Sequence, residues 1–466
     1  MVLAKQKLNI PQQIADMLKT IEREKCKAYI AGPCVSELLA GRSPMDYDII
    51  TNAGFEEMMY IFRDMRIVSR DRKMSSVMVS VPGMVVQVSS YRKGVVNGEA
   101  VYTDNYLYDL VGRDFSANAI AYHPRKGFKD PFDGMECIEG EVITLKAIGE
   151  YPIKLWKEND LDENELTLKL EPQSSLKTNP ENILNALIFL GDGNYVIDEV
   201  TAKAMKENAP LLLTIEKEVL YTKLTRLMLT RNISQVMRQF PTVFCDICPD
   251  LRAAFEFLPK ENFGIDLWEH ICRTVEFSPP QPASRYTALF HNAGNPDCYS
   301  DDGTGTEHYY GHCELARIIA GRFLSSITSD KKLLETVDFL LEYHDVEIKE
   351  DRIHLKRIMN DMEAEELKSI IKLRIADDMA KPSVHEGKVA SYRRSLQILD
   401  DIVKSGECCK KSQLAVSKTD LINRRLANNE KQASHIIDML YEAVLEQPKL
   451  NLAPILIDMV KKTIKK

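Results

Sequence analysis

The chain has 466 residues, of which 44% are hydrophobic and 28% are charged, and its formal net charge at pH 7 is -8. Single hydrophobic cores stop growing near about 250 to 300 residues, so this length predicts several domains. The sequence has no apolar run long enough to span a bilayer and no signal-peptide pattern at its start, which predicts a cytoplasmic protein without a membrane partner. The acidic total excludes a uniformly basic surface for nucleic acid, but it is compatible with one local basic face.

The first 150 residues mix helical and strand patterns, which predicts an α/β head. Residues 11–25 form an amphipathic helix whose apolar face consists of Ile14, Met17, Leu18 and Ile21. The short apolar strand AYIAG follows, then a helix that Gly41 ends, then a second strand, YDIIT. Two alternating segments joined by Pro82 and Gly83 predict a β-hairpin.

The rest of the chain divides into an acidic segment and a helical region. Residues 151–179 are polar and acidic with little periodicity, which is typical of an exposed insertion or linker. After Pro180 apolar residues recur at helical spacing almost to the end. The fold class that follows is a mixed-sheet α/β head followed by a long all-α region.

The ten cysteines are scattered, and only Cys245 and Cys248 have CxxC spacing. A structural zinc site would need a second pair of ligands nearby in space. The pair therefore has two interpretations, buried thiols near a helix end or part of a metal or redox site, and we favour the first. Neither interpretation implies disulfides.

The strongest chemical pattern is Asp46-Tyr47-Asp48, which follows Gly32 after thirteen intervening residues. Residues i and i+2 of a strand point to the same face, so the two carboxylates would project together. Such a pair suits Mg²⁺, and two ions there can activate an attacking hydroxyl and stabilise a leaving pyrophosphate. Without further context, the Asp-x-Asp pattern has an alternative interpretation, a solvated loop.

Two longer segments carry a family resemblance. Residues 28–53, AYIAGPCVSELLAGRSPMDYDIITNA, resemble the GGxVRDxLLGR motif, the DxD pair and the Thr-Asn-Ala turn of tRNA nucleotidyltransferases (CCA-adding enzymes) and bacterial poly(A) polymerases. Residues 108–134, YDLVGRDFSANAIAYHPRKGFKDPFDG, are similar to the RRDFTxNAxAY motif and DPFGG turn of the same family. The two motifs agree with the family in order and spacing, and the similarity continues into the C-terminal helices.

The resemblance implies an enzyme that transfers a nucleoside monophosphate from a nucleoside triphosphate to an RNA 3′ end. The implied partners are tRNA or another RNA, with ATP, CTP or another triphosphate, and the implied cofactor is Mg²⁺. The family's head holds metal and triphosphate, its neck recognises the base, and its body and tail hold tRNA. The corresponding ranges here are a head (1–150), an acidic insertion (151–179), a neck (180–260), a body (261–400) and a tail (401–466).

Matching positions imply roles for individual residues. Asp46 and Asp48 match the catalytic metal ligands. The residues matching the nucleotide site are Gly32, Arg113, Asp114, Asn118, Asn182 and Asn185. Arg113 suits phosphate physically, because a guanidinium is always charged and can donate two parallel hydrogen bonds. A local salt bridge at a helix start is the alternative interpretation of Arg113 and Asp114.

The sequence departs from the family pattern in the nucleotide site. The second glycine is replaced by Pro33, which has no N–H to donate to a phosphate oxygen. Other family residues are replaced by Ser36, Glu37, Gln87 and Gly112.

The neck motif EDxxRxxR matches residues 178–185, where asparagines, Asn182 and Asn185, replace both arginines. We therefore expect the neck helix to persist and the selection between C and A to change.

A second resemblance lies in the predicted body, whose segments are similar to an HD phosphohydrolase domain. His270, His291 and Asp377 match its metal ligands, whereas Asn292 replaces the aspartate of its central His-Asp pair. Neutral imidazoles favour a softer metal such as Zn²⁺ or Ni²⁺. We favour a retained helical scaffold without hydrolase activity.

Three functions remain open from sequence. The first is CCA-type addition to tRNA, and the second is the same chemistry with altered nucleotide selection. The third is a non-catalytic protein of the same fold that binds RNA or another partner. Intact Asp46 and Asp48 favour catalysis, whereas Pro33, Ser36 and Gln87 favour the third function.

Overall fold

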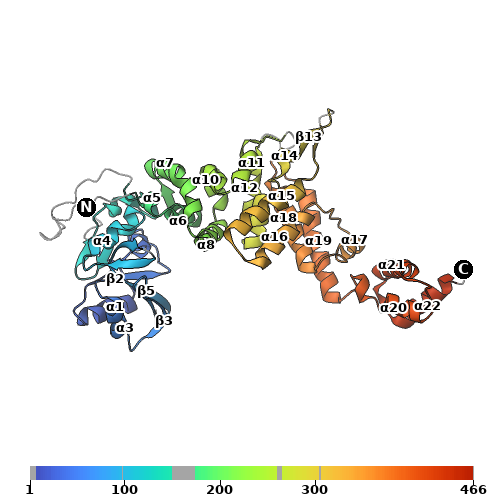
Figure 1. Cartoon of the computed structure of the whole chain (residues 1–466), viewed down its shortest axis with the longest axis horizontal. Helices are drawn as coiled ribbons and strands as arrows, with labels where there is room; N and C mark the ends of the chain where they lie inside the picture. Colours follow the sequence, from blue (N-terminus) through green and yellow to red (C-terminus); the bar gives the residue numbers. More distant parts are fainter. Residues whose placement is uncertain (1–6, 97, 150–173, 260–264, 304–305, 465–466) are drawn as a thin grey trace. The chain divides into compact units, whose positions relative to one another are not determined.

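The computed structural model describes residues 7–96, 98–149, 174–259, 265–303 and 306–464 (Figure 1). The chain divides into two compact units, Met1–Asn232 and Ile233–Lys466. The predicted head therefore lies in the first unit together with the start of the predicted neck, and the range 180–260 spans the boundary. Most of the predicted acidic insertion, namely residues 151–173 of 151–179, lies outside the described residues.

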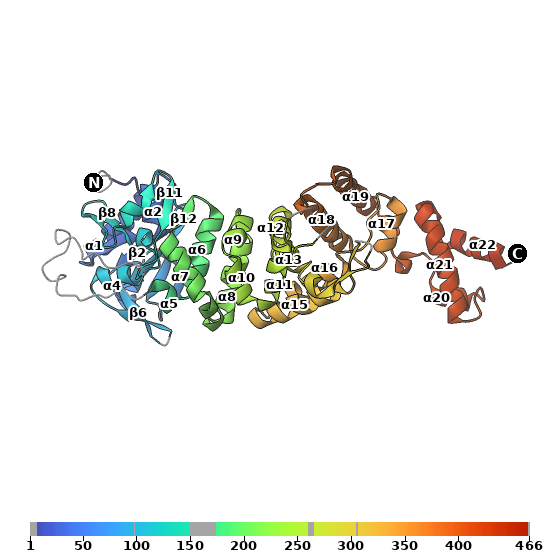
Figure 2. The same cartoon turned by 90° about the horizontal axis from the view of Figure 1, so that it is seen from above.

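A seven-stranded mixed sheet lies at the centre of the first unit (Figures 1 and 2). Its strands, in spatial order, are β3 (Arg66–Asp71), β4 (Ser76–Val81), β5 (Met84–Ser90), β2 (Tyr47–Thr51), β1 (Ala28–Ala31), β8 (Ala121–His123) and β9 (Gly127–Lys129). All neighbouring pairs are antiparallel except β2 and β5, which run parallel. The predicted strands and the β4–β5 hairpin are confirmed, and Gly83 takes the positive φ of 86° that its turn requires.

Helices cover the sheet, and the sequence pattern explains the first of them. Helix α1 (Gln12–Arg23) buries all four residues of the predicted apolar face. The other helices of the head are α2 (Pro33–Leu39), α3 (Phe55–Ile61) and α4 (Tyr106–Val111), with the 3₁₀ turns η2 (Ser116–Ala119) and η3 (Gly134–Cys137). A separate hairpin pairs β6 (Arg92–Val96) with β7 (Glu99–Tyr102).

The first unit ends in helices and one unexpected strand. Its helices are α5 (Ser175–Thr178), α6 (Glu181–Asp192), α7 (Glu199–Asn208), η4 (Ala209–Thr214) and α8 (Lys217–Met228). The strand β12 (Tyr195–Ile197) pairs parallel with β11 (Val142–Leu145), which also pairs with β10 (Ile138–Glu139). The prediction of helix alone was wrong here, because Gly193 and Asn194 take positive φ values of 91° and 61° and turn the chain back to β11.

The second unit is helical, as predicted, apart from the short hairpin of β13 (Tyr299–Asp301) and β14 (Glu307–Tyr309). Its helices begin with α9 (Ile233–Gln239), α10 (Pro241–Ile247), α11 (Arg252–Glu256), α12 (Leu267–Phe277), α13 (Pro282–Phe290), α14 (Asn295–Cys298) and α15 (His312–Ile327). They continue with α16 (Lys331–Tyr343), α17 (Arg352–Ile358), α18 (Ala364–Ala380), α19 (Glu386–Ser405), α20 (Lys418–Asn423), α21 (Glu430–Glu446) and α22 (Ala453–Ile464). Among the described residues of this unit, one hydrophobic core is centred on α16 to α19 and another on α20 to α22.

The CxxC pair lies at a helix end, as the buried-thiol interpretation predicted. Cys245 is in α10, Cys248 directly follows it, and both are buried. Burial raises the pKa of Cys248 to about 12, which keeps its thiol protonated and unreactive near neutral pH. Within the described residues, neither thiol belongs to a group that could hold a metal. Among the same residues no helix is both long and apolar enough to cross a bilayer.

Gly134 lets η3 pack tightly against η2, the turn that contains Asn118. A Cβ atom at position 134 would lie 2.2 Å from the Ser116 carbonyl oxygen. We predict that Gly134→Ala lowers the free energy of unfolding by about 1–3 kcal/mol, because backbone must move to admit the methyl group. Urea denaturation followed by circular dichroism measures this. Gly112→Ala is the control, since its nearest contact is 3.6 Å; equal losses in both variants would contradict the packing argument.

Candidate active site

The alternation of β2 orients the two predicted metal-binding aspartates. Tyr47 and Ile49 point into the core, with 5% and 0% of their surface exposed. Asp48 therefore faces the opposite side, and the same alternation predicts that Asp46, directly before the strand, faces that side too. Asp46 is exposed, whereas Asp48 is partly buried. Burial raises the pKa of Asp48, and the nearby Asp46 charge adds to the effect, although the Arg113 charge opposes it.

Gly32 brings the start of α2 next to Asp48 and Arg113. A Cβ atom at this glycine would lie 2.7 Å from Nη1 of Arg113 and 3.3 Å from Oδ2 of Asp48. Gly32 also has a φ of 96°, a conformation that other residues rarely adopt. Three predicted site residues from three separate segments therefore meet at one place, and the glycine is needed for their close approach.

Arg113 is oriented by an acidic residue that our sequence analysis missed. Its Nη2 donates to Oδ1 of buried Asp109 at 3.2 Å, and its Nη1 to the Asn118 carbonyl at 3.4 Å. Arg92 also lies 4.0 Å from Asp109. The salt bridge of Arg113 is thus made with Asp109, four residues earlier, and not with Asp114 as the alternative interpretation expected, and its role toward a nucleotide stays a prediction. The four-residue spacing between Asp109 and Arg113 could have indicated this pair from the sequence.

Asp114 and Asn118 form a polar brace inside the head. Asn118 donates from Nδ2 to Oδ1 of Asp114 at 2.9 Å, and the Phe115 N–H donates to the same oxygen at 2.8 Å. Burial raises the pKa of Asp114, and these hydrogen bonds partly offset the rise. Asn118 is only 2% exposed. The brace supports the loop after Arg113, and direct nucleotide contact by these two residues stays a prediction.

The neck asparagines join a hydrogen-bond chain that ends at a lysine. Asn182 is buried and donates to the Ser175 carbonyl at 3.1 Å, and Asn185 donates to Oδ1 of Asn182 at 3.2 Å. Lys223 of α8 donates to Oδ1 of Asn185 at 2.7 Å and lies 3.7 Å from Glu181. Sequence reasoning missed Lys223, because no motif links it to a residue 38 positions away.

The departures from the family pattern are accommodated locally. Pro33 is the first residue of α2, where a helix leaves its N–H groups unpaired in any case. Ser36 is buried and donates to the Pro33 carbonyl at 3.0 Å, and Glu37 accepts a hydrogen bond from the Tyr195 hydroxyl at 2.9 Å. Gln87 is the register partner of Asp48 across the parallel β2–β5 pair. A neutral amide therefore lies beside the aspartate where the family has a carboxylate.

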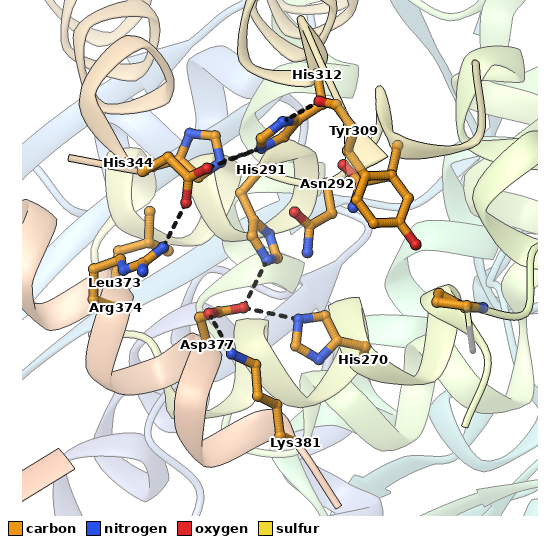
Figure 3. A pocket seen from close by; sticks show the side chains of 13 residues that line it. His270, His291, Asn292, Tyr309, His312, His344, Leu373, Arg374, Asp377 and Lys381 are labelled. Carbon is orange, nitrogen blue, oxygen red and sulfur yellow. Dashed lines mark hydrogen bonds and ion pairs between the residues drawn. The ribbon is translucent and has the colours of Figure 1, made fainter. Parts of the chain in front are cut away.

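In the second unit, the structure brings together three residues expected from the HD resemblance (Figure 3). Oδ1 of Asp377 lies 2.9 Å from Nε2 of His270 and 3.5 Å from Nε2 of His291. Burial opposes ionisation of Asp377, but the hydrogen bond with His270, the nearby His291 ring and the Lys381 charge outweigh it and hold its pKa well below the usual range. Asn292 lines the same cavity, of about 260 Å³.

The cavity also contains His312 and His344, which sequence reasoning did not identify as ligands (Figure 3). Their Nε2 atoms are 3.3 Å apart, and Sγ of Cys313 lies 3.5 Å from Nε2 of His312. The described residues thus contain two groups of side chains suited to a metal ion. The adjacent His312 and Cys313 were the available signal, but their partner His344 is 32 residues from His312.

Comparison with known proteins agrees with this geometry. Residues 28–144 match the family described as "Poly A polymerase head domain". Poly(A) polymerase I of Haemophilus influenzae is 24% identical over 260 residues, 52% of this chain and 52% of its own length. The CCA-adding enzyme of Geobacillus kaustophilus is 27% identical over 293 residues, 59% of this chain and 65% of its own length. The matches therefore span between half and two thirds of these relatives.

Solved structures show the same fold over nearly the whole chain. The Bacillus stearothermophilus CCA-adding enzyme in complex with CTP has a TM-score of 0.61 and 19% identity, and the match covers 97% of this chain and 98% of that one. The Thermotoga maritima CCA-adding enzyme complexed with tRNA has a TM-score of 0.52 and 15% identity, with 99% and 98% covered. Residues 28–144 thus match the poly(A) polymerase head domain, and the chain is similar to CCA-adding enzymes and poly(A) polymerases, as the sequence motifs indicated.

The partly buried carboxylate of Asp48 is expected to lower the stability of the folded protein at neutral pH. A carboxyl whose pKa is raised in the folded state destabilises the protein above that pKa and has no such effect below its unfolded pKa. Asp48→Asn should therefore raise the thermal midpoint at pH 7, with a gain that shrinks as the pH falls through the carboxylate range. Differential scanning calorimetry with a chelator present measures this. Asp46→Asn, at the exposed aspartate, is the control and should change little; an equal gain there would refute the burial argument.

Proposed function

We propose that this chain is an RNA 3′-end nucleotidyltransferase that transfers a nucleoside monophosphate from a nucleoside triphosphate and releases pyrophosphate. One observation carries the proposal. Asp48 and Arg113 both lie next to Gly32, and the charges of Arg113 and Asp46 both act on Asp48. This arrangement combines acidic ligands for a cation with a fixed positive charge for phosphate. It fits the transfer of a group that carries several negative charges.

The residues present fit Mg²⁺ as the cofactor. Asp46 and Asp48 supply hard carboxylate oxygens, and burial together with the Asp46 charge raises the pKa of Asp48, which a bound cation would oppose. Gln87, beside Asp48, can offer an amide oxygen where the family has a third carboxylate. Metal ions held by Asp46 and Asp48 would supply Lewis-acid activation of the 3′-hydroxyl and charge stabilisation of the leaving pyrophosphate.

The protein residues position the triphosphate. The buried carboxylate of Asp109 holds the guanidinium of Arg113 near Asp48, so that its position is set before the nucleotide binds. The small Gly32 leaves room for this approach. Asp114 and Asn118 keep the loop after Arg113 rigid through their mutual hydrogen bond.

Nucleotide selection is expected to differ from that of CCA-adding enzymes. The two asparagines at the positions of the neck arginines bond to each other and to Ser175, so their amides are partly used within the protein. Lys223 brings one positive charge to this group from α8. We propose that Lys223 takes part in nucleotide recognition in place of the arginines.

The proposed acceptor is tRNA or another RNA 3′ end, and the proposed donors are ATP, CTP or another triphosphate. Purified protein is incubated with tRNA lacking CCA, Mg²⁺ and each labelled triphosphate separately. Addition of C and then A indicates CCA-type activity, and one nucleotide or a different one indicates altered selection. Retention of tRNA without extension would replace our proposal with the non-catalytic alternative, which Pro33, Ser36 and Gln87 favour.

The double variant Asp46→Ala with Asp48→Ala tests the site itself. Labelling should fall by at least about 100-fold, since both proposed metal ligands are removed. Gel-based primer extension measures the labelling, and circular dichroism checks that the helical content is unchanged. A folded double variant that still labels RNA would show that our site assignment is wrong.

Lys223→Met tests nucleotide recognition. It removes the charge but keeps most of the side-chain length, and we expect KM for the preferred triphosphate to rise about tenfold, equivalent to the loss of one charge-assisted hydrogen bond. Steady-state kinetics with each triphosphate measures this. Lys203→Met, at an exposed lysine that pairs with Glu207 on α7, is the matched control. An unchanged KM and unchanged nucleotide preference in Lys223→Met would remove this residue from the proposal.

A further inference from the structure

We propose that the open face of strands β3, β4 and β5 holds the single-stranded 3′ end of the acceptor RNA, with Arg66 on one of its phosphates. This inference rests on the proposed function, because it concerns the second substrate of the same site. It assigns that substrate to a surface of the head sheet next to Asp48.

The register of the sheet places two rows of side chains beside the acidic pair. Strands β2, β5, β4 and β3 lie next to one another in that order (Figure 1). One row consists of register partners on these four strands, namely Asp48, Gln87, Met78 and Ser69. The next row consists of Val85, Ser80 and Arg66. Extending the β2–β5 register by one residue predicts that Asp46 adjoins Val85. Directly paired residues share a face of the sheet, so both rows lie on the face of Asp48.

This face is exposed, whereas the other face of the same strands is part of the core. Met78 and Val85 each have 39% of their surface exposed, and Arg66 and Ser69 are exposed as well. The buried valines of the other face are Val77, Val79, Val86 and Val88. A ligand can therefore lie across β5, β4 and β3 and still reach Asp48.

The geometry of the transfer decides which substrate lies there. The attacking hydroxyl and the leaving pyrophosphate stand in line on opposite sides of the phosphorus. Gly32, with Arg113 beside it, directly follows β1, which flanks β2 on the side away from β5. Because these two residues are proposed to hold the triphosphate, the 3′-hydroxyl is expected to approach Asp48 from the side of β5.

The charges on this face suit a polyanion. In the two rows, strands β3, β4 and β5 supply no carboxylate. Arg66, at the outer end of the second row, has no hydrogen bond or ion pair from its side chain to any residue that the structure describes. A guanidinium keeps its charge and can donate two parallel hydrogen bonds to a phosphate. Between Arg66 and the aspartates, Met78 and Val85 offer apolar surface to bases and riboses.

The width of the surface sets how much RNA it can hold. Neighbouring strands lie about 4.8 Å apart, so β3, the third strand from β2, is about 14 Å from it. Stacked nucleotides rise by about 3.4 Å each, so this span holds about four of them. The surface therefore fits a short unpaired 3′ end, with Arg66 near the phosphate about four nucleotides from the terminus.

Arg66→Gln tests the contact through RNA binding, without any transfer. Two RNA hairpins are compared, one with an unpaired 3′ end of about four nucleotides and one blunt, with Mg²⁺ present and no triphosphate. We expect the wild type to bind the hairpin with the unpaired end at least about threefold more tightly, and Arg66→Gln to lose most of this preference. The slope of log K against log salt for that hairpin should also become shallower by about 0.7, the value for one phosphate contact on a single strand. Fluorescence anisotropy measures both quantities.

Arg70→Gln is the matched control. Arg70 is another exposed arginine of β3, and its side chain likewise has no partner among the described residues. It pairs with buried Val77, so it lies on the opposite face of the strand. Arg70→Gln should keep both the preference and the slope. Equal losses in the two variants, an unchanged preference in Arg66→Gln, or a wild type that binds both hairpins equally would overturn the proposal.

Met78→Glu tests the middle of the surface. A carboxylate two strands from β2 would repel the phosphates, and we expect it to abolish the preference for the unpaired end. Val142→Glu adds the same charge in β11, outside this sheet, at a valine that is 41% exposed, and it should bind like the wild type. An unchanged preference in Met78→Glu would contradict the proposal. Thermal midpoints close to that of the wild type show that the variants fold.

These measurements separate the surface from the chemistry. A protein that prefers the unpaired end as expected but incorporates no nucleotide would retain this RNA surface and lose the proposed transferase function. A protein that incorporates nucleotide without the preference would retain the function and refute the surface.

Discussion

The parallel pairing of β2 with β5 is the constraint on which the candidate active site depends. It fixes the register in which Tyr47 and Ile49 fill the core while Asp48 lies opposite Gln87. Because the side-chain period of a strand is two, a slip of one residue would turn both aspartates into the core and destroy the site. The hydrophobic pattern of YDIIT therefore specifies the fold and the position of the acidic pair at the same time.

A partly buried carboxylate costs stability, and the head limits that cost by supplying positive charge. The charge of Arg113 favours ionisation of Asp48, and Asp109 anchors that arginine from the helix before it. The pKa of Asp48 nevertheless stays raised, because burial outweighs the charge of Arg113. Asp109 affects Asp48 only indirectly, by holding Arg113 in place. For this reason no family motif identified Asp109.

Much of the fold followed from local pattern, whereas the contacts between distant residues did not. The buried face of α1 and the β4–β5 hairpin are set by periodicities of 3.6 and 2 residues, which a sequence displays directly. The strand β12 was missed because its partner β11 lies far away in sequence. Lys223 was missed for the same reason, and so was His344. Such pairings depend on how helices and strands pack in three dimensions, and the spacing of residues along the sequence does not reveal them.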